Sequence, residues 1–340
     1  MNSHGLRRLL RHAILRRDAG KSPAINIRNA SLIEPSDERE RSAPAIEDGA
    51  PQGDVLARCA TVQGYAGATD RQTVRMLVTA LGDAEPLVRW EAAAALAQTA
   101  QNLDKPQVIQ RVFGRDGAAP LTTGELLAWL RQSLAAPDPA QREAVADALG
   151  RWPQQAAVEI LIKALGDEAP RVRASAALSL GRLGAIEALE GLSAALGDPS
   201  SWVRGAAADA LGALGDSRAA GALAALAAEG PTLARVAAIS ALGRLPSREA
   251  RQQLLACLAD ESGEIRWHAA RALQTVGTVA ALPELERLLG DAYCLFDQPI
   301  YAVAGAAIRA IRQREQGAWH AVRHAFFHLW GWLRRLRRPR

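Results

Sequence analysis

The sequence has few aromatic residues and few cysteines. Aromatic side chains make up 4% of the 340 residues although 49% are hydrophobic, so the apolar content is mostly alanine and leucine. Both are good helix formers, and strand-forming residues never cluster in an alternating run, which predicts an all-α fold. The three cysteines (Cys59, Cys257 and Cys294) are odd in number and far apart. This excludes a disulfide framework and indicates a reducing, cytoplasmic compartment.

The sequence also lacks a run of about 18 consecutive apolar residues, so we expect no membrane-spanning helix. The start, Gly5–Arg11, superficially resembles a twin-arginine export signal. However, Arg16 and Arg17 interrupt the stretch that would have to be apolar, and no small-residue cleavage site follows. We therefore expect no export.

Net positive charge is missing from the body of the chain. The chain carries +5, but residues 1–28 carry +6 and residues 318–340 carry another +6, which leaves −7 on residues 29–317. Nucleic-acid binding needs several unopposed basic side chains along the binding surface. The charge distribution therefore makes nucleic acid an unlikely partner.

The body of the chain repeats itself with a 31-residue period. An arginine recurs at Arg58, Arg89, Arg142, Arg173, Arg204, Arg235 and Arg266. Consecutive members are one period apart except for Arg89 and Arg142, whose separation of 53 equals one period plus 22 inserted residues. The next repeat unit carries Tyr301, 35 residues after Arg266, where an arginine is expected. Such a period is typical of a stacked repeat protein.

Apolar positions keep the same register. Three residues after the last six of these arginines stand Ala92, Val145, Ala176, Ala207, Ala238 and Ala269, and seven after them stand Leu96, Leu149, Leu180, Leu211, Leu242 and Leu273. These offsets share one face of a helix. In the unit that starts at Asp198, the aspartate is expected to cap a helix with Pro199 at its first position. That helix runs to about Leu214, and after Gly215 and Asp216 a second one covers 218–228. Stacked neighbours would bury the apolar face of each pair.

The repeat units have a recognisable sequence. Leu165-Gly166-Asp167, Val172-Arg173 and Leu180-Gly181 form one unit, and Leu196-Gly197-Asp198, Val203-Arg204 and Leu211-Gly212 form the next. These units resemble the PBS-lyase HEAT-like repeat family over about residues 54–315. The resemblance implies an α-α superhelix, a HEAT-like solenoid of about eight helix pairs.

The resemblance also implies possible activities. Some similar proteins assist bilin attachment, and others are di-iron hydroxylases with paired His-Glu dipeptides on repeat helices. This chain has no His-Glu dipeptide, and Trp267-His268-Ala269 occupies a comparable place without the acid. We therefore do not expect a hydroxylase. A bilin-lyase-like role, or another oxidoreductase-associated maturation role, stays open as the alternative.

Charged residues recur with the repeat as well. An acid stands six residues before most of the arginines, which gives Asp83 and Arg89, Asp167 and Arg173, Asp198 and Arg204, Glu229 and Arg235, and Asp260 and Arg266. We interpret these residues as a structural ladder along one edge of the stack rather than as a phosphate-binding stripe, because networks of charges hold register better than single exposed pairs. This interpretation predicts that Arg204→Ala lowers thermal stability.

The pattern breaks in two internal places. The insertion around residues 101–122 contains Phe113 and is either a recognition loop or a tolerated insertion. The segment Tyr293–Pro299 lengthens the last turn between repeats by four residues. Its Tyr293 and Phe296 are candidate partner contacts, or else they fold under the following helix as its cap.

Both ends of the chain differ from the repeats. Residues 1–53 form a basic segment with a linker expected to be disordered. After a helix end expected at Gly317, residues 316–340 form a basic amphipathic helix whose Trp319, Trp330, Arg334 and Arg335 are candidate contacts. This helix either caps the stack, which we favour, or meets an anionic membrane or an acidic partner. His320, His324 and His328 cannot converge on one tetrahedral metal from a single helix.

The sequence has no phosphate loop, no dinucleotide motif, no metal-ligand cluster and no nucleophile signature. We therefore expect no cofactor and no catalytic residues. The favoured function is a non-catalytic protein–protein interaction scaffold or assembly factor, located in the cytoplasm or at the periphery of a membrane.

Overall fold

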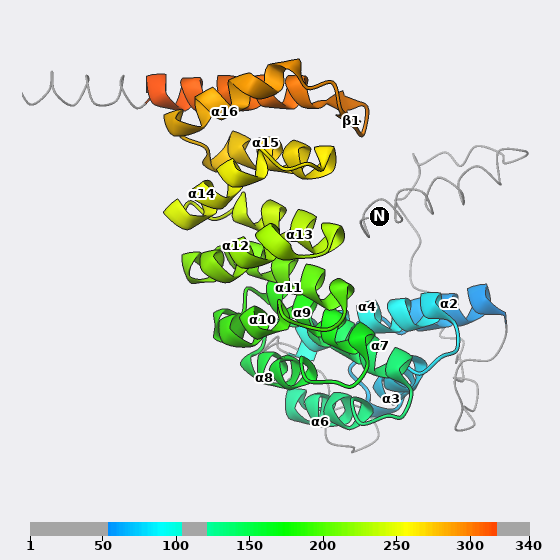
Figure 1. Cartoon of the computed structure of the whole chain (residues 1–340). Helices are drawn as coiled ribbons and strands as arrows, with labels where there is room; N and C mark the ends of the chain where they lie inside the picture. The colour runs from blue at the N-terminus through cyan, green and yellow to red at the C-terminus, as the bar shows by residue number, and fades with distance from the viewer. Residues whose placement is uncertain (1–53, 104–120, 318–340) are drawn as a thin grey trace, which may run out of the picture. The chain divides into compact units, whose positions relative to one another are not determined.

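A computed structural model describes residues 54–103 and 121–317 of the chain. All of these residues lie within one compact unit, Asp48–Arg340. Apart from turns and one short hairpin, the described residues are helical, and Figure 1 shows the helices stacked pair upon pair from α2 to α16. The predicted all-α solenoid is therefore confirmed.

Each pair consists of a first and a second helix. The first helices are α2 (Val55–Gly64), α4 (Pro86–Leu103), α7 (Pro139–Leu149), α9 (Pro170–Leu183), α11 (Ser201–Leu214), α13 (Thr232–Leu242) and α15 (Gly263–Val276). The second helices are α3 (Arg71–Ala80), α6 (Thr123–Ser133), α8 (Gln155–Ala164), α10 (Leu189–Ala195), α12 (Ala220–Glu229), α14 (Arg248–Cys257) and α16 (Leu282–Arg287). The described part thus holds seven pairs, and the helix of residues 300–317 begins an eighth.

Short elements complete the pairs. Single 3₁₀ turns lead into three of the second helices and follow the last one; they are η1 (Ile186–Ala188), η2 (Ser217–Ala219), η3 (Val279–Ala281) and η4 (Leu288–Gly290). After α16 the strands β1 (Cys294–Leu295) and β2 (Gln298–Pro299) pair antiparallel. Among the described residues this hairpin is the only β-structure, and the other connections between pairs are turns.

The core is continuous because first helices pack on first helices. Helix α9 contacts α7 and α11, α13 contacts α11 and α15, and α12 contacts α14 in the second layer. The leucines seven residues after the arginines from Arg89 to Arg266 are at most 2% exposed. No pair closes its core alone, so each pair is stabilised by its neighbours.

A column of glycines lets the first helices approach closely. Gly150, Gly181, Gly212 and Gly243 each follow the buried leucine of their repeat. A Cβ on Gly212 would lie 2.8 Å from the Cα of Ala241 in the next first helix, and one on Gly181 would lie 2.7 Å from the Cα of Ala210. Because real Cβ atoms do not approach that closely, a side chain at these positions would push the repeats apart.

The start of α11 differs from the prediction. Ser200 is its N-cap, and Asp198 lies two residues earlier, where its Oδ1 accepts a hydrogen bond from the Ser200 N–H at 2.8 Å. Pro199 therefore precedes the helix, although proline does occupy the first position of α7 and α9. The predicted end was right, because Gly215 follows Leu214 with a φ of 70°. The second helix begins as the 3₁₀ turn η2 and continues as α12 to Glu229.

Some predictions fall on residues outside the described ranges. These are the ones for Phe113, Trp319, Trp330, Arg334, Arg335 and the three C-terminal histidines. Gly317, where a helix end was expected, is still helical at the last described position. Within the described ranges, no helix is both long enough and apolar enough to cross a membrane.

Candidate interaction surface

The ladder arginines link consecutive repeats. Arg173 on α9 donates from Nε and Nη2 to the two carboxylate oxygens of Asp198, at 2.7 and 2.9 Å, and Asp198 lies just before α11. Its Nη1 donates to the backbone oxygens of Asp167 at 2.8 Å and of Glu168 at 3.0 Å. The arginine therefore reaches 25 residues forward to an acid and six residues back to a carbonyl. We call each arginine–acid pair with this forward spacing a rung.

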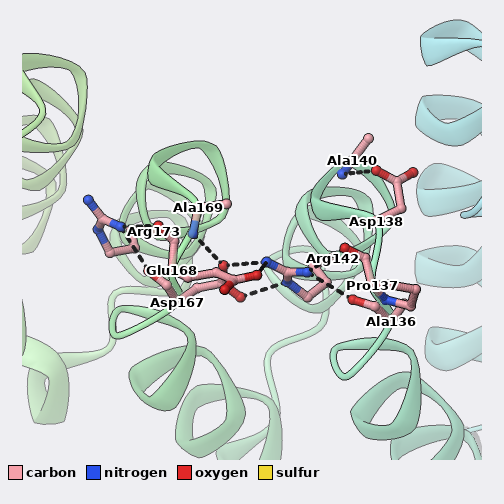
Figure 2. Close-up of polar contacts among 9 residues, drawn as sticks. All are labelled: Ala136, Pro137, Asp138, Ala140, Arg142, Asp167, Glu168, Ala169 and Arg173. Atoms are coloured by element: carbon pink, nitrogen blue, oxygen red, sulfur yellow. Dashed lines mark hydrogen bonds and ion pairs between the residues drawn. The ribbon is translucent and has the colours of Figure 1, made fainter.

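The acid of each rung also shapes the turn that precedes a first helix. Figure 2 shows this for Arg142 and Asp167, whose side chains are joined by two hydrogen bonds of 2.8 Å. Asp167 Oδ1 also accepts the N–H of Ala169 at 2.8 Å, while Arg142 Nη1 donates back to the carbonyl of Ala136. One aspartate thus fixes its own turn and holds the preceding repeat.

Charge pairing keeps these acids ionised. The hydrogen bond from Arg173 lowers the pKa of Asp198 below its ordinary value, against a smaller opposing effect of burial. At Asp167 burial favours the neutral form, but the hydrogen bonds from Arg142 and from the Ala169 N–H prevail and lower the pKa. The arginines of intact rungs have their donors engaged within the stack. This geometry supports a structural role for the ladder rather than a ligand site.

Two rungs are missing from the described part. Glu229 stands at the rung spacing after Arg204, but α12 continues through Glu229, which is exposed, and no ion pair joins the two. Arg204 instead donates Nη1 to the carbonyls of Asp198 and Pro199, and its buried Nε has no partner. Arg89 bonds only to the carbonyls of Asp83 and Ala84, and it forms no ion pair with any described residue. In the sequence pattern both arginines belong to the ladder, because that pattern pairs each arginine with the acid six residues before it, not with the residue 25 positions after it.

The same comparison missed rungs that do form. Arg58 pairs with Asp83 at 3.1 Å, and Arg266 pairs with Asp291 at 2.8 Å. Arg235 pairs with Asp260 across the next interface. Each of these acids lies 25 residues after its arginine, so a search at that spacing would have identified Asp291 from the sequence.

The lengthened last turn is a hairpin that displays Phe296. Phe296 and Asp297 form its tip with φ angles of 51° and 59°. Positive φ at both positions is the type I′ geometry, which favours asparagine and glycine. A bulky side chain in this conformation is strained, and such strain concentrates at functional sites. Phe296 is nevertheless 76% exposed.

A small aromatic hollow lies beneath this tip. Trp267 on α15 donates its indole N–H to the Gln298 carbonyl at 3.0 Å, and the Phe296 ring meets it edge-on at 5.8 Å. These residues, with His268 and Arg271, line a hollow of about 270 Å³. Burial, followed by the charge of Arg271, lowers the pKa of His268, so the imidazole is neutral at pH 7.

The predicted contacts in this turn stay close together. Tyr293 lies against the backbone of Gly263, where any Cβ would overlap its ring, and it is partly exposed. Tyr301, which replaces the ladder arginine, is exposed and donates its backbone N–H to the backbone oxygen of Asp291 at 3.1 Å. Tyr293, Phe296 and Tyr301 are all exposed in or next to this turn. Whether it also caps a following helix concerns residues outside the described ranges.

Comparisons with known proteins agree with the fold. A family model for HEAT repeats matches residues 127–199, 187–235 and 222–293. No curated protein sequence matches the chain. Among solved structures, the chain is similar to YibA of Escherichia coli, with 18% identity, a TM-score of 0.50, and coverage of 76% of this chain and 88% of that one.

A second solved structure is human deoxyhypusine hydroxylase in complex with glycerol. It is 22% identical with a TM-score of 0.32, and the match covers 78% of this chain and 92% of that one. At 18% identity the likeness to YibA shows the fold alone, and the likeness to the hydroxylase carries no argument.

Proposed function

The chain is a HEAT-repeat protein, and from this premise we propose that it is a non-catalytic protein-interaction scaffold or assembly factor. Its partners are one or more proteins that it meets in the cytoplasm. One contact region is the hairpin tip with Tyr293 and Phe296. Contact with an acidic partner or an anionic membrane through the basic ends involves residues outside the described ranges.

One observation carries this proposal, and it is the conformation of Phe296. A type I′ turn made of Phe and Asp is less stable than one made of Asn and Gly. A protein that needed only to connect two helices would gain stability by using the favoured residues. The exposed ring beside an aromatic hollow is instead the kind of anchor that is enriched in protein interfaces. We therefore propose that Phe296 occupies this strained position because a partner protein binds its ring.

The variant Phe296→Asn tests this assignment. Asparagine tolerates the left-handed conformation, so the variant should melt at the same temperature as the parent or higher. In affinity purification of the intact chain, the parent should retain one partner at a stoichiometric level, and the variant should retain less than a tenth of it. The matched control is Val279→Asn, which removes an apolar side chain that is exposed elsewhere.

The possible outcomes separate the alternatives. Retention of the same partner by Phe296→Asn would remove the hairpin from the contact surface, and recovery of no stoichiometric partner by the parent would contradict the scaffold. The bilin-lyase-like alternative makes a different prediction. It requires a change in visible absorbance when the protein is incubated with a bilin, and a scaffold produces none.

A further inference from the structure

Helices α11 and α13 present an exposed apolar surface with one acid in it. Trp202 on α11 and Leu233 on α13 stand at equivalent places in consecutive repeats and are 48% and 62% exposed. One turn further along α11 lies Gly205, where an added Cβ would meet nothing nearer than Ala237 of α13 at 3.9 Å. Gly205 is itself buried and leaves room for a Cβ between the two helices. Asp209, one turn beyond Gly205, ends this surface.

Asp209 is a carboxylate without a partner. It makes no hydrogen bond or ion pair with any described residue. Desolvation by the surrounding protein raises its pKa above the ordinary value, and the more distant charge of Arg244 only partly offsets this. The side chain is exposed, so an incoming group can reach it. An unpaired acid beside exposed apolar side chains favours a cation that also brings apolar contacts.

The same chain shows what such an acid binds when a partner is present. Asp147 holds in α7 the position that Asp209 holds in α11. Arg151, four residues later on the same helix, donates Nε and Nη2 to Asp147 Oδ2 at 3.1 and 2.7 Å. Its guanidinium also lies 5.6 Å from the ring centroid of Trp90. Arg182 of the next repeat adds a third bond to Asp147 at 2.7 Å.

One of these two arginine positions is altered beside Asp209, and the other keeps its arginine without the bond. The place of Arg151 is taken by Ala213, which is exposed and has no donor. Arg244 stands at the position of Arg182, at the same spacing after Asp209; its charge acts on the Asp209 carboxylate, but no hydrogen bond or ion pair joins the two side chains. The missing rung between Arg204 and Glu229 falls at this same interface. Asp209 therefore lacks counterparts of the bonds that Asp147 accepts from Arg151 on the same helix and from Arg182 of the next repeat.

We propose that the α11–α13 surface binds an arginine side chain of a partner protein, in the place that Arg151 fills beside Asp147. The guanidinium pairs with Asp209, the alkyl stem lies over Gly205, and neighbouring apolar residues of the partner pack on Trp202 and Leu233. The ligand is thus a basic peptide segment with at least one apolar residue next to its arginine. This inference rests on the proposed scaffold function but concerns a surface other than the hairpin.

The variant Ala213→Arg tests this proposal, because the new arginine would itself pair with Asp209 and so block a partner's arginine. It recreates beside Asp209 the spacing of Asp147 and Arg151, on an exposed helical position that accepts arginine readily. The probe is a displayed library of random 12-residue peptides selected against the full chain. Selected peptides are then labelled with fluorescein, and their affinities are measured by fluorescence anisotropy.

The parent should enrich peptides that contain arginine next to an apolar residue. Ala213→Arg and Asp209→Asn should each weaken the best peptide at least tenfold, and so should citrulline in place of its arginine, since citrulline keeps the shape without the charge. Trp202→Ala should weaken it as well. The matched control Glu187→Gln neutralises an exposed acid on η1 and should leave the affinity unchanged. Thermal melting checks the fold, and neither Ala213→Arg nor Asp209→Asn should lower the melting temperature.

Several results would overturn the inference. One is a set of enriched peptides without basic residues, and another is an affinity that Ala213→Arg leaves within twofold. Enrichment that is no greater for the parent than for Ala213→Arg would do the same. None of these results depends on the hairpin, so a partner that is lost in Phe296→Asn but not in Ala213→Arg would leave the scaffold proposal standing while this one fails.

Discussion

Replacing Arg173 with alanine should destabilise the protein much more than the same change at Arg204. The two arginines occupy the same position in consecutive first helices, and each donates Nη1 to two carbonyl oxygens of the preceding turn. Only Arg173 also has an acid to reach, because Asp198 accepts its two remaining bonds. Arg204 makes no ion pair with Glu229, the acid at the rung spacing, and its Nε has no hydrogen-bond partner.

The expected difference in unfolding free energy comes from the hydrogen bonds that only Arg173→Ala removes. Loss of the carbonyl bonds is common to both and costs about 1 kcal/mol in each. Arg173→Ala also removes two charge-assisted bonds to a carboxylate within a pair whose side chains are 14% and 9% exposed. Losing these bonds from a pair this buried lowers the free energy of unfolding by about a further 2 kcal/mol. The cost is not larger, because Asp198 still accepts the Ser200 N–H. We expect about 3 kcal/mol for Arg173→Ala and about 1 kcal/mol for Arg204→Ala.

The assay is thermal unfolding of the full chain followed by circular dichroism. For a protein of this size a difference of about 2 kcal/mol corresponds to roughly 3–4 °C between the two melting temperatures. The control is Arg171→Ala, because Arg171 pairs with Glu143 at 2.9 Å through side chains that are 46% and 31% exposed. An exposed pair of this kind contributes about 0.5 kcal/mol.

Equal destabilisation by Arg173→Ala and Arg204→Ala would refute the reasoning, because the forward rung would then contribute nothing beyond the carbonyl bonds. A loss at Arg171 as large as that at Arg173 would refute it as well, since burial would then not decide the strength of a pair.

Two further predictions concern packing and pH. Gly212→Ala should lower the free energy of unfolding by about 1 kcal/mol in urea denaturation, since overpacking against Ala241 costs about 2 kcal/mol and outweighs the helix-forming gain of about 1 kcal/mol. Gly221→Ala on α12, where nothing lies within 4 Å, should instead be neutral or stabilising; the opposite order of these two variants would contradict the packing argument. Because the folded state lowers the pKa values of Asp167 and Asp198, their contribution to stability is complete at neutral pH and is lost as the pH falls below about 5. Melting temperatures measured down that range should fall less steeply for Asp198→Asn than for the parent, and parallel curves would exclude this carboxylate as a source of the acid sensitivity.

The candidate site could be predicted only in part. Tyr293 and Phe296 were identified because they interrupt the repeat, but their backbone conformation and the hollow beneath them depend on contacts with Trp267 and Gln298 of other elements. Asp209 gave no signal, because it does not break the period, and only the structure decides that Trp202 is exposed rather than buried. Their significance appears only when Asp209 is compared with Asp147, whose arginine partners are known from the packed structure.

The sequence by itself determined the helix pairs, the 31-residue period and the buried leucine columns. The physical reason is that helix periodicity and apolar patterning are local properties, and a stack of identical units carries them from one repeat to the next. It placed the acids and arginines in register but could not say which would pair. Tertiary structure decided that the arginines reach forward to the acid of the next repeat. Arg204 fails to do so because α12 continues through Glu229, and only the packing of neighbouring repeats fixes which carboxylates remain unpaired.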